Sequence, residues 1–168
     1  MPDDKPYFRF NPRAYETGRA FEPSDDDCDV CNRPSVWRYT GNLYAKKRPV
    51  VCARCIASDA IERFMNGDFF AFHDIELLEA DADLEAELLQ RTPGVACFNP
   101  YEWPVIDGKP LAFLGYGDDK ELAASAPARS ASREAFRVLG ADVDEPSPYA
   151  LIFKEIDGEN YRAAIDMD

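Results

Sequence analysis

The sequence lacks the features of a membrane or secreted protein. In its 168 residues, no uncharged apolar run approaches the ~20 residues that a transmembrane helix needs, which argues against an α-helical membrane protein. The first residues contain neither a basic stretch nor an apolar segment, so we expect no signal peptide and predict a cytoplasmic protein. Histidine is also scarce, and any imidazole base would have to be His73.

The composition is that of a folded domain. Apolar residues make up 46% of the chain, and its aromatic residues are 11 Phe, 8 Tyr and 2 Trp. A chain of this kind can bury enough apolar surface to offset the entropy lost on folding, which excludes a mainly disordered protein. At this length a core is stable without cross-links.

Negative charge is concentrated in the C-terminal part of the chain. The formal net charge is −13, from 19 basic and 32 acidic residues. Residues 1–60 hold ten basic and nine acidic residues, whereas residues 61–168 hold nine basic and twenty-three acidic ones. Such a surface repels nucleic acid and anionic membranes and attracts basic partners, although acidic charge also serves solubility alone.

Four of the five cysteines form two pairs, each with a two-residue spacer, and twenty residues separate the pairs. These are Cys28, Cys31, Cys52 and Cys55. The spacing is typical of a structural zinc site, because one turn can present two thiolates to one tetrahedral ion. The alternatives are two disulfides, which a cytosolic chain disfavours, four free thiols, or an iron–sulfur cluster. We predict structural Zn²⁺ with all four positions filled by protein, which leaves no position for catalysis.

The residues around these cysteines predict a treble-clef-like module over residues 24–67. Residues 36–39 and 43–45 are rich in aromatic and β-branched residues and flank a Gly-Asn turn, which predicts a β-hairpin. Residues 56–65 predict a helix that ends at Asn66-Gly67 and has the second cysteine pair at its N-terminus. A zinc ribbon, with the second pair on another hairpin, is the alternative.

Three consecutive cations, Lys46, Lys47 and Arg48, lie on the predicted hairpin. They could bind phosphate, or they could keep an exposed strand edge from pairing with another chain. Because the rest of the chain is acidic, a nucleic-acid-binding zinc finger is the weaker interpretation.

The remainder of the chain predicts an acidic α+β body. Residues 74–91 combine helical apolar periodicity with seven acidic residues, which indicates either a solvated face or a docking face for a basic partner. Further helices are expected at about 119–125 and 132–139. Residues 149–156 and 160–167 predict a closing β-hairpin.

Together these patterns predict an α+β protein in two parts. Residues 1–67 would hold an N-terminal strand, over Tyr7–Phe10, and the four-cysteine zinc module of hairpin plus helix. Residues 68–168 would form the acidic α+β body with the C-terminal β-hairpin. The two parts are expected to share one core, because the apolar face of the finger helix needs a partner.

An enzyme would have to use few candidates. His73 lies beside an aromatic cluster and a predicted helix start, where a surface or capping histidine is the simpler interpretation. Cys97 could pair with His73 as a nucleophile, but its apolar neighbours favour a small buried hydrophobic residue. An active site in the Pro-rich segment 95–117, around Trp103, would require a concave pocket and a buried His73.

Several motifs together resemble the CbrC-like family of uncharacterised bacterial proteins. In chain order they are Phe8-Arg9-Phe10-Asn11-Pro12, the two cysteine pairs, Cys55-Ile56-Ala57, Arg91-Thr92-Pro93-Gly94 and Ala112-Phe113-Leu114-Gly115. The resemblance implies no biochemical activity, because none is established for the family. Relatives carry further tryptophan, polar and cysteine residues after Gly94, and cysteines on the last hairpin. Of all these, this chain keeps only Trp103. The resemblance therefore carries over only the four finger cysteines as ligands.

The sequence thus predicts a zinc-binding, non-catalytic interaction protein. Its acidic face would dock a basic protein partner, as an immunity or antitoxin protein docks a basic toxin through electrostatic steering. An enzyme using His73 or Cys97 and a nucleic-acid-binding finger using Lys46, Lys47 and Arg48 are the alternatives.

Overall fold

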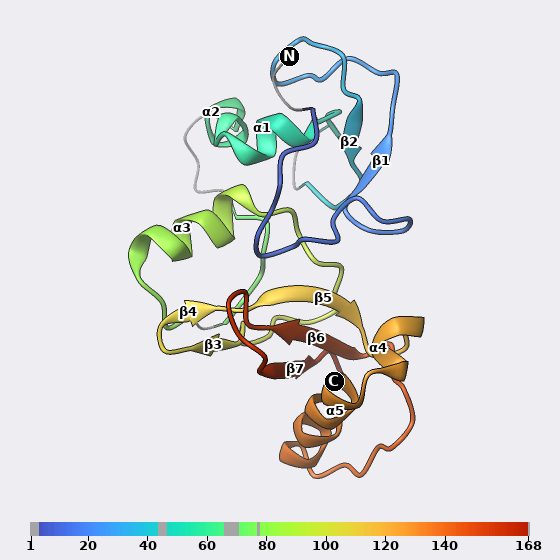
Figure 1. Cartoon of the computed structure of the whole chain (residues 1–168). Coiled ribbons are helices and arrows are strands. Elements are labelled where there is room, and N and C mark those ends of the chain that lie inside the picture. The colour runs from blue at the N-terminus through green and yellow to red at the C-terminus, as the bar shows by residue number, and fades with distance from the viewer. Residues whose placement is uncertain (1–3, 44–46, 66–70, 77, 168) are drawn as a thin grey trace. The chain divides into compact units, whose positions relative to one another are not determined.

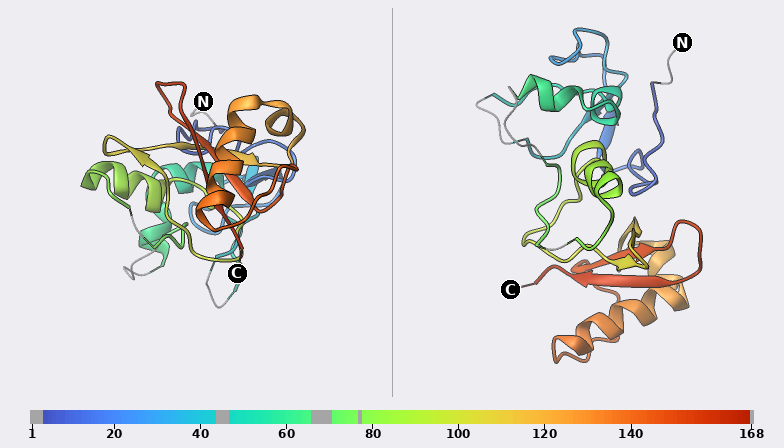
Figure 2. Two further views of the ribbon diagram at one scale, coloured as in Figure 1. Left: turned by 90° about the horizontal axis from the view of Figure 1, so that it is seen from below. Right: turned by 90° about the vertical axis from the view of Figure 1, so that its left-hand side faces the viewer.

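A computed structural model describes the chain except for residues 1–3, 44–46, 66–70, 77 and 168 (Figure 1). The chain divides into two compact units. The N-terminal unit comprises residues 1–73 and 85–96, and the C-terminal unit comprises residues 74–84 and 97–168. Both contain helices and small antiparallel sheets, which confirms a mixed α+β protein (Figures 1 and 2). The predicted boundary at residue 67 and the shared core stay predictions.

The first sheet of the N-terminal unit is a two-stranded ribbon of β1 (Phe21–Pro23) and β2 (Trp37–Tyr39), with Phe21 opposite Tyr39. The other edge of β2 is also occupied, because Tyr39 N–H donates to Val51 O at 2.8 Å and Arg38 forms a bridge with Cys52. The predicted hairpin between 36–39 and 43–45 is therefore wrong for β2, and residues 44 and 45 lie outside the described residues.

The predicted strand over Tyr7–Phe10 is also wrong. This segment turns, and Asn11 N–H donates to Phe8 O at 3.0 Å. Phe8 and Phe10 are both buried. Burial at every second residue would also fit a strand, but the backbone turns at residues 9 and 10. Phe8 stacks on Phe21 of β1, with ring centroids 5.5 Å apart, so Phe8 packs against the ribbon.

Two short helices replace the predicted helix at 56–65. They are α1 (Ala53–Ala57) and α2 (Ala60–Phe64). Ile56 of α1 and Ile61 of α2 are buried in the same apolar core. The break is at Asp59, whose φ of 58° is left-handed and cannot continue a helix. The predicted stop at Asn66-Gly67 lies outside the described residues.

Helix α3 (Ala82–Arg91) is shorter than the predicted 74–91 helix. The carboxylate of Asp81 accepts hydrogen bonds from the backbone N–H groups of Asp83 and Leu84, at 3.1 and 3.0 Å. This is a helix N-cap, so the acidic residues before Asp81 precede the helix instead of lying on its face.

Each residue of the Arg91-Thr92-Pro93-Gly94 motif contacts a different part of the N-terminal unit. Arg91 pairs with Asp59 at 3.4 Å, and Thr92 Oγ1 donates to the α3 carbonyl of Glu87 at 3.0 Å. The carbonyl of Pro93 accepts from Asn11 Nδ2 at 3.4 Å, and Gly94 N–H donates to Tyr39 Oη at 3.1 Å. The motif thus joins the helices, the N-terminal segment and the ribbon of its unit.

The C-terminal unit is built on a three-stranded antiparallel sheet in the order β5-β6-β7. Its strands are β5 (Ala112–Tyr116), β6 (Ala150–Lys154) and β7 (Tyr161–Ile165), and a small β3 (Val105–Ile106) and β4 (Lys109–Pro110) hairpin precedes them. Strands β6 and β7 pair with Leu151 opposite Ala164, which confirms the predicted closing hairpin.

One face of this sheet packs against a long helix. Helices α4 (Lys120–Ala124) and α5 (Ala126–Val138) follow β5, and α5 runs along β6 and β7 (Figure 2). Phe136 of α5 and Ile152 of β6 are buried in the same apolar cluster. The break between α4 and α5 lies at Ser125, and α5 begins earlier than the predicted residue 132. Pro127 fits into its first turn, where the missing N–H costs nothing.

Glycine at position 94 is required by its neighbours. A Cβ at this position would lie 2.6 Å from Tyr39 Oη and 2.9 Å from Phe72 O, closer than van der Waals contact allows. We expect Gly94→Ala to lower the free energy of unfolding by about 1–3 kcal/mol in urea denaturation. In a Tyr39→Phe background the added penalty should be smaller, because one of the two clashing atoms is gone. An equal penalty in both backgrounds would contradict this account.

Candidate metal centre

The four cysteines of the two pairs come together in the N-terminal unit. Their Sγ atoms all lie within 4.8 Å of one another. Cys28 Sγ is 3.8 Å from Cys55 Sγ, and Cys31 Sγ is 3.8 Å from Cys52 Sγ. A tetrahedral ion with metal–sulfur bonds of about 2.3 Å places its sulfurs about 3.8 Å apart. The four sulfurs can therefore hold one metal ion.

A tight turn presents the first pair. Asn32 N–H donates to Cys28 O at 2.8 Å, and Cys28 N–H donates to Arg33 O at the same distance. Asn32 has a left-handed φ of 55°, a conformation that asparagine tolerates better than most residues. These bonds close the Cys-Asp-Val-Cys segment and turn both sulfurs to one side.

The start of α1 presents the second pair. Cys52 is the N-cap residue and Cys55 lies in the first turn, which confirms the predicted placement at a helix N-terminus. Cys55 N–H donates to Cys52 O at 3.0 Å, and this bond brings the two side chains to the same side of the turn.

Backbone hydrogen bonds hold the two pairs against each other. Cys52 N–H donates to Cys28 Sγ at 3.3 Å. Asp29 N–H donates to Val50 O at 2.9 Å, and the Asp29 carboxylate accepts from Val50 N–H at 2.7 Å. The sequence reasoning passed over Asp29, whose position inside the first Cys-x-x-Cys pair was the signal that it could organise the site.

The thiols are crowded in a way that a cation would relieve. Cys28, Cys52 and Cys55 are buried, and Cys31 is half-buried. Hydrogen bonds from the Cys52 and Cys55 side chains lower the pKa of the Cys28 thiol, and the same contact with Cys28 raises the pKa of Cys55. Adjacent thiolates repel one another without a metal, whereas a divalent cation stabilises all four.

His73 is buried in the N-terminal unit, so the expectation of a surface or capping histidine is wrong. Burial disfavours the imidazolium and lowers the pKa of His73 to about 4, while a backbone hydrogen bond with Thr92 acts in the opposite direction. His73 is therefore neutral at physiological pH. The aromatic residues that precede it in the sequence were the signal of an apolar environment.

Cys97 is half-buried in the C-terminal unit, and burial with the nearby Asp166 and Asp74 raises the pKa of its thiol to about 11. A thiol in this state is a poor nucleophile at neutral pH. His73 and Cys97 belong to different compact units.

Within segment 95–117, the alternative active site, two aromatic residues contribute to the core. Trp103 is buried, donates from Nε1 to Leu111 O at 3.0 Å, and packs edge-on against Phe153 with centroids 4.9 Å apart. The side chain of Tyr101 is buried beside it. These contacts give Trp103 and Tyr101 a structural role, whereas Phe98 of the same segment is 86% exposed.

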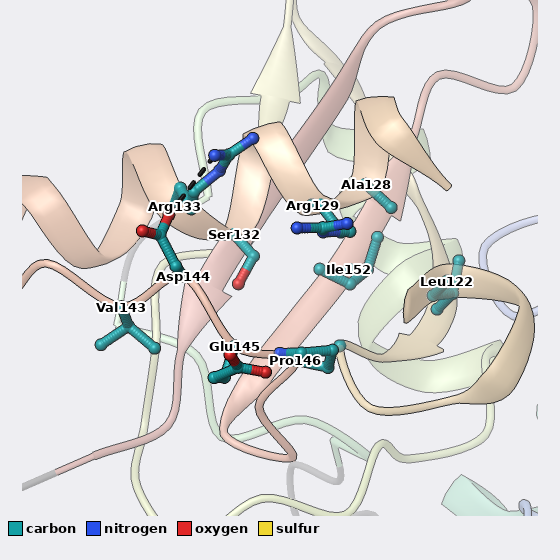
Figure 3. Close-up of a pocket in the computed structure, with 11 residues that line it drawn as sticks. Leu122, Ala128, Arg129, Ser132, Arg133, Val143, Asp144, Glu145, Pro146 and Ile152 are labelled. Carbon is teal, nitrogen blue, oxygen red and sulfur yellow. Dashed lines mark hydrogen bonds and ion pairs between the residues drawn. The ribbon is translucent and has the colours of Figure 1, made fainter. Parts of the chain in front are cut away.

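A pocket in the C-terminal unit lies between α5, the 143–146 loop and the sheet (Figure 3). Its volume is about 10 Å³, room for about one water molecule. An ion pair between Arg133 and Asp144 lies at its wall, with 3.3 Å between the charged atoms. His73, Cys97 and Trp103 do not line it.

Several arginines of the N-terminal unit pair with carboxylates. Arg13 pairs with Glu16 at 2.7 Å, and Arg9 pairs with Glu87. Of the three consecutive cations, Lys46 lies outside the described residues, Lys47 is exposed, and Arg48 donates to Thr40 O at 2.7 Å.

Acid should destabilise the protein through His73. Its pKa is lowered from 6.5 to about 4 in the folded state, so the unfolded state binds the proton first as the pH falls. Stability present above pH 6.5 is therefore lost between pH 6.5 and 4. Between pH 7 and 5 the wild type should lose about 2 kcal/mol more than His73→Gln in urea denaturation. Equal losses would show that His73 is not buried in its neutral form.

Comparison with known proteins shows which proteins the chain is similar to. The chain is 29% identical to a Pseudomonas aeruginosa protein over 122 residues, which cover 70% of this chain and 66% of that one. It is also 29% identical to proteins of Mycobacterium bovis and Mycobacterium tuberculosis over 156 residues, 89% of this chain and 81% of theirs. All three carry the family designation UPF0167.

No solved structure matches the chain. Within the described residues, no helix is both long and apolar enough to cross a membrane. The model of the uncharacterised protein family UPF0167 matches residues 5–147, a span that contains all four clustered cysteines, and the chain belongs to that family.

Proposed function

We propose that Cys28, Cys31, Cys52 and Cys55 bind one structural Zn²⁺ and that the protein is a non-catalytic interaction protein. The observation that carries the metal assignment is the pair of 3.8 Å Sγ–Sγ distances, which equal the edge of a tetrahedral zinc–tetrathiolate site. An iron–sulfur cluster would hold its cysteines farther apart, because several iron and sulfide ions lie between them. A limit of 4.8 Å among all four sulfurs favours a single ion.

The proposed zinc is structural and not catalytic. Four protein thiolates complete its tetrahedron, so no position is open for water or substrate. A reducing cytoplasmic setting would keep these thiols available to the metal.

The arrangement of the ligands supports a treble-clef-like module. The first pair lies on a tight turn, and the second lies at the start of α1, whereas a zinc ribbon would place both pairs on hairpins. Within this family, the motifs around these cysteines also support the narrower CbrC-like assignment.

The acidic docking face can be defined more narrowly than residues 74–91. Asp74, Glu76, Glu79 and Asp83 are exposed, and they form the proposed face. Two other acidic residues of this stretch have structural contacts, since Asp81 caps α3 and Glu87 pairs with Arg9. A basic protein partner would be attracted to the exposed carboxylates by long-range steering, as in immunity or antitoxin complexes.

The zinc proposal predicts one Zn²⁺ per chain in the purified protein, measured by elemental analysis. Cys52→Ser should lower the metal content and the melting temperature, because a ligand is lost and three thiolates remain crowded. Cys97→Ser is the matched control and should keep the full metal content. A wild-type protein that stays folded through exhaustive chelation, with no metal bound, would overturn the proposal.

The docking proposal predicts a partner that binds through charge. Tagged protein is used to capture ligands from nuclease-treated native lysate at low and high salt, and the captured proteins are identified by mass spectrometry. We expect a stoichiometric basic protein that is lost at high salt, because salt screens the attraction between exposed charges.

A matched pair of charge reversals locates the face. The triple change Glu76→Lys, Glu79→Lys and Asp83→Lys should abolish capture. The triple change Glu102→Lys, Asp118→Lys and Glu134→Lys alters net charge equally, at exposed positions of the same unit, and should retain it. Capture that survives the first change, or is lost equally with both, would reject this face.

A further inference from the structure

One aromatic side chain of the C-terminal unit is almost fully exposed. Phe98 is 86% exposed, although phenylalanine is among the residue types most often buried. Its backbone is nevertheless held in place, because the Asp166 carboxylate accepts from the N–H groups of Phe98 and Asn99 at 2.7 and 2.9 Å. Asp166 is itself buried. A buried carboxylate therefore fixes the backbone that presents an apolar ring to solvent.

Two other exposed apolar residues adjoin Asp166. The carbonyl of Tyr149 accepts from Asp166 N–H at 2.8 Å, and Met167 follows Asp166 in the chain. Tyr149 and Met167 are both exposed. Phe98, Tyr149 and Met167 are called the apolar patch below. Exposed apolar residues that gather at one place are typical of interaction sites, whereas isolated ones are ordinary.

The apolar patch is near the proposed acidic face. Ile75 forms a parallel bridge with Tyr101, and Glu76 N–H donates to Tyr101 O at 3.2 Å. Residues 74–76 therefore lie beside the segment that carries Phe98. Tyr101 is three residues from Phe98 in the sequence, a stretch that spans at most about 11 Å. Both segments belong to the same compact unit.

The charges beside the patch select its partner. Asp74 and Glu76 are exposed, and the chain has a net charge of −13. Carboxylates in this position repel an anionic membrane and a second copy of the same acidic chain, and they attract cations. An apolar centre with a polar rim is the usual anatomy of a protein–protein interface. The partner that fits is a basic protein whose docking segment has apolar side chains bordered by lysine or arginine.

We propose that Phe98 is the apolar anchor of the docking face and that its ring inserts between apolar side chains of a basic partner. The inference rests on the proposed acidic face and specifies the partner of that face. Charge acts mainly on the rate of association, whereas a packed aromatic side chain acts mainly on the rate of dissociation. Because Asp166 already holds the backbone of Phe98, less entropy is lost when the ring is bound.

The test uses two fluorescent helical peptides of identical lysine and leucine composition. In one peptide the leucines form a stripe, and in the other they are spread around the helix. Only the stripe offers gaps between apolar side chains that receive a ring. We expect the wild type to bind the striped peptide about tenfold more tightly, measured by fluorescence anisotropy.

Variants of Phe98 test the anchor. Phe98→Ala should remove the preference for the striped peptide by speeding its dissociation, and Phe98→Leu should keep part of it. The matched control is Ile156→Ala, which should keep the preference. Ile156 is an exposed apolar residue of the same unit, in the turn between β6 and β7, at the end of this hairpin opposite Asp166.

A second pair of variants tests the charges. Asp74→Asn with Glu76→Gln should weaken binding of both peptides and lower its salt dependence, because fewer charges attract them. The control is Asp107→Asn with Asp157→Asn, which removes equal charge at exposed positions in the turns after β3 and β6. This control should weaken binding much less.

The outcomes separate the two proposals. If the Asp74 and Glu76 variant weakens binding but Phe98→Ala leaves the peptide preference unchanged, the anchor is rejected and the acidic face stands. If the charge variant and its control weaken binding equally, net charge alone attracts the peptides, and the face and the anchor are both rejected. A wild type that sediments as a dimer while Phe98→Ala sediments as a monomer would reassign the patch to self-association and overturn the inference.

Discussion

The convergence of four cysteine sulfurs is the constraint on which the N-terminal unit depends. Cys28 and Cys31 lie on one turn and Cys52 and Cys55 on another, and the chain between them includes β2. Cys52 N–H donates to Cys28 Sγ, Asp29 N–H donates to Val50 O, and Val50 N–H donates to the Asp29 carboxylate. These hydrogen bonds fix both ends of the segment between the two cysteine pairs at the cluster. The regular elements of this unit are only three to five residues long outside α3, too short to be stable without such a constraint.

The Arg91-Thr92-Pro93-Gly94 motif supplies the second constraint on the same unit. It begins at the last residue of α3 and contacts Asp59, Asn11 and Tyr39, which are far apart in sequence. Arginine supplies charge, threonine a hydroxyl, and glycine the space that Tyr39 Oη and Phe72 O require. A motif that resembles a family signature is thus explained by packing, with no need of catalysis.

The sequence sufficed where local spacing determines structure, and failed where distant contacts decide. Two Cys-x-x-Cys pairs predicted the cluster, and the pattern of residues 149–156 and 160–167 predicted the β6–β7 hairpin. The pairing of β2 with β1 could not be predicted, because it depends on Phe21 packing against Tyr39 across the ribbon. His73 and Asp59 were missed for a similar reason, since burial and a left-handed φ arise from tertiary packing.

The distribution of charge connects the site to the proposed role. In the N-terminal unit, arginines such as Arg9, Arg13 and Arg54 pair with carboxylates, so the charges there stabilise local structure. In residues 74–83 the exposed carboxylates lie before α3 or in its first turn. Asp81 caps the helix, and the carboxylates of the proposed face are the other exposed ones. At neutral pH His73 is neutral and the Cys97 thiol is protonated, and the proposed metal site has no open ligand position. We therefore propose that the exposed carboxylates of residues 74–83 recognise a partner by charge.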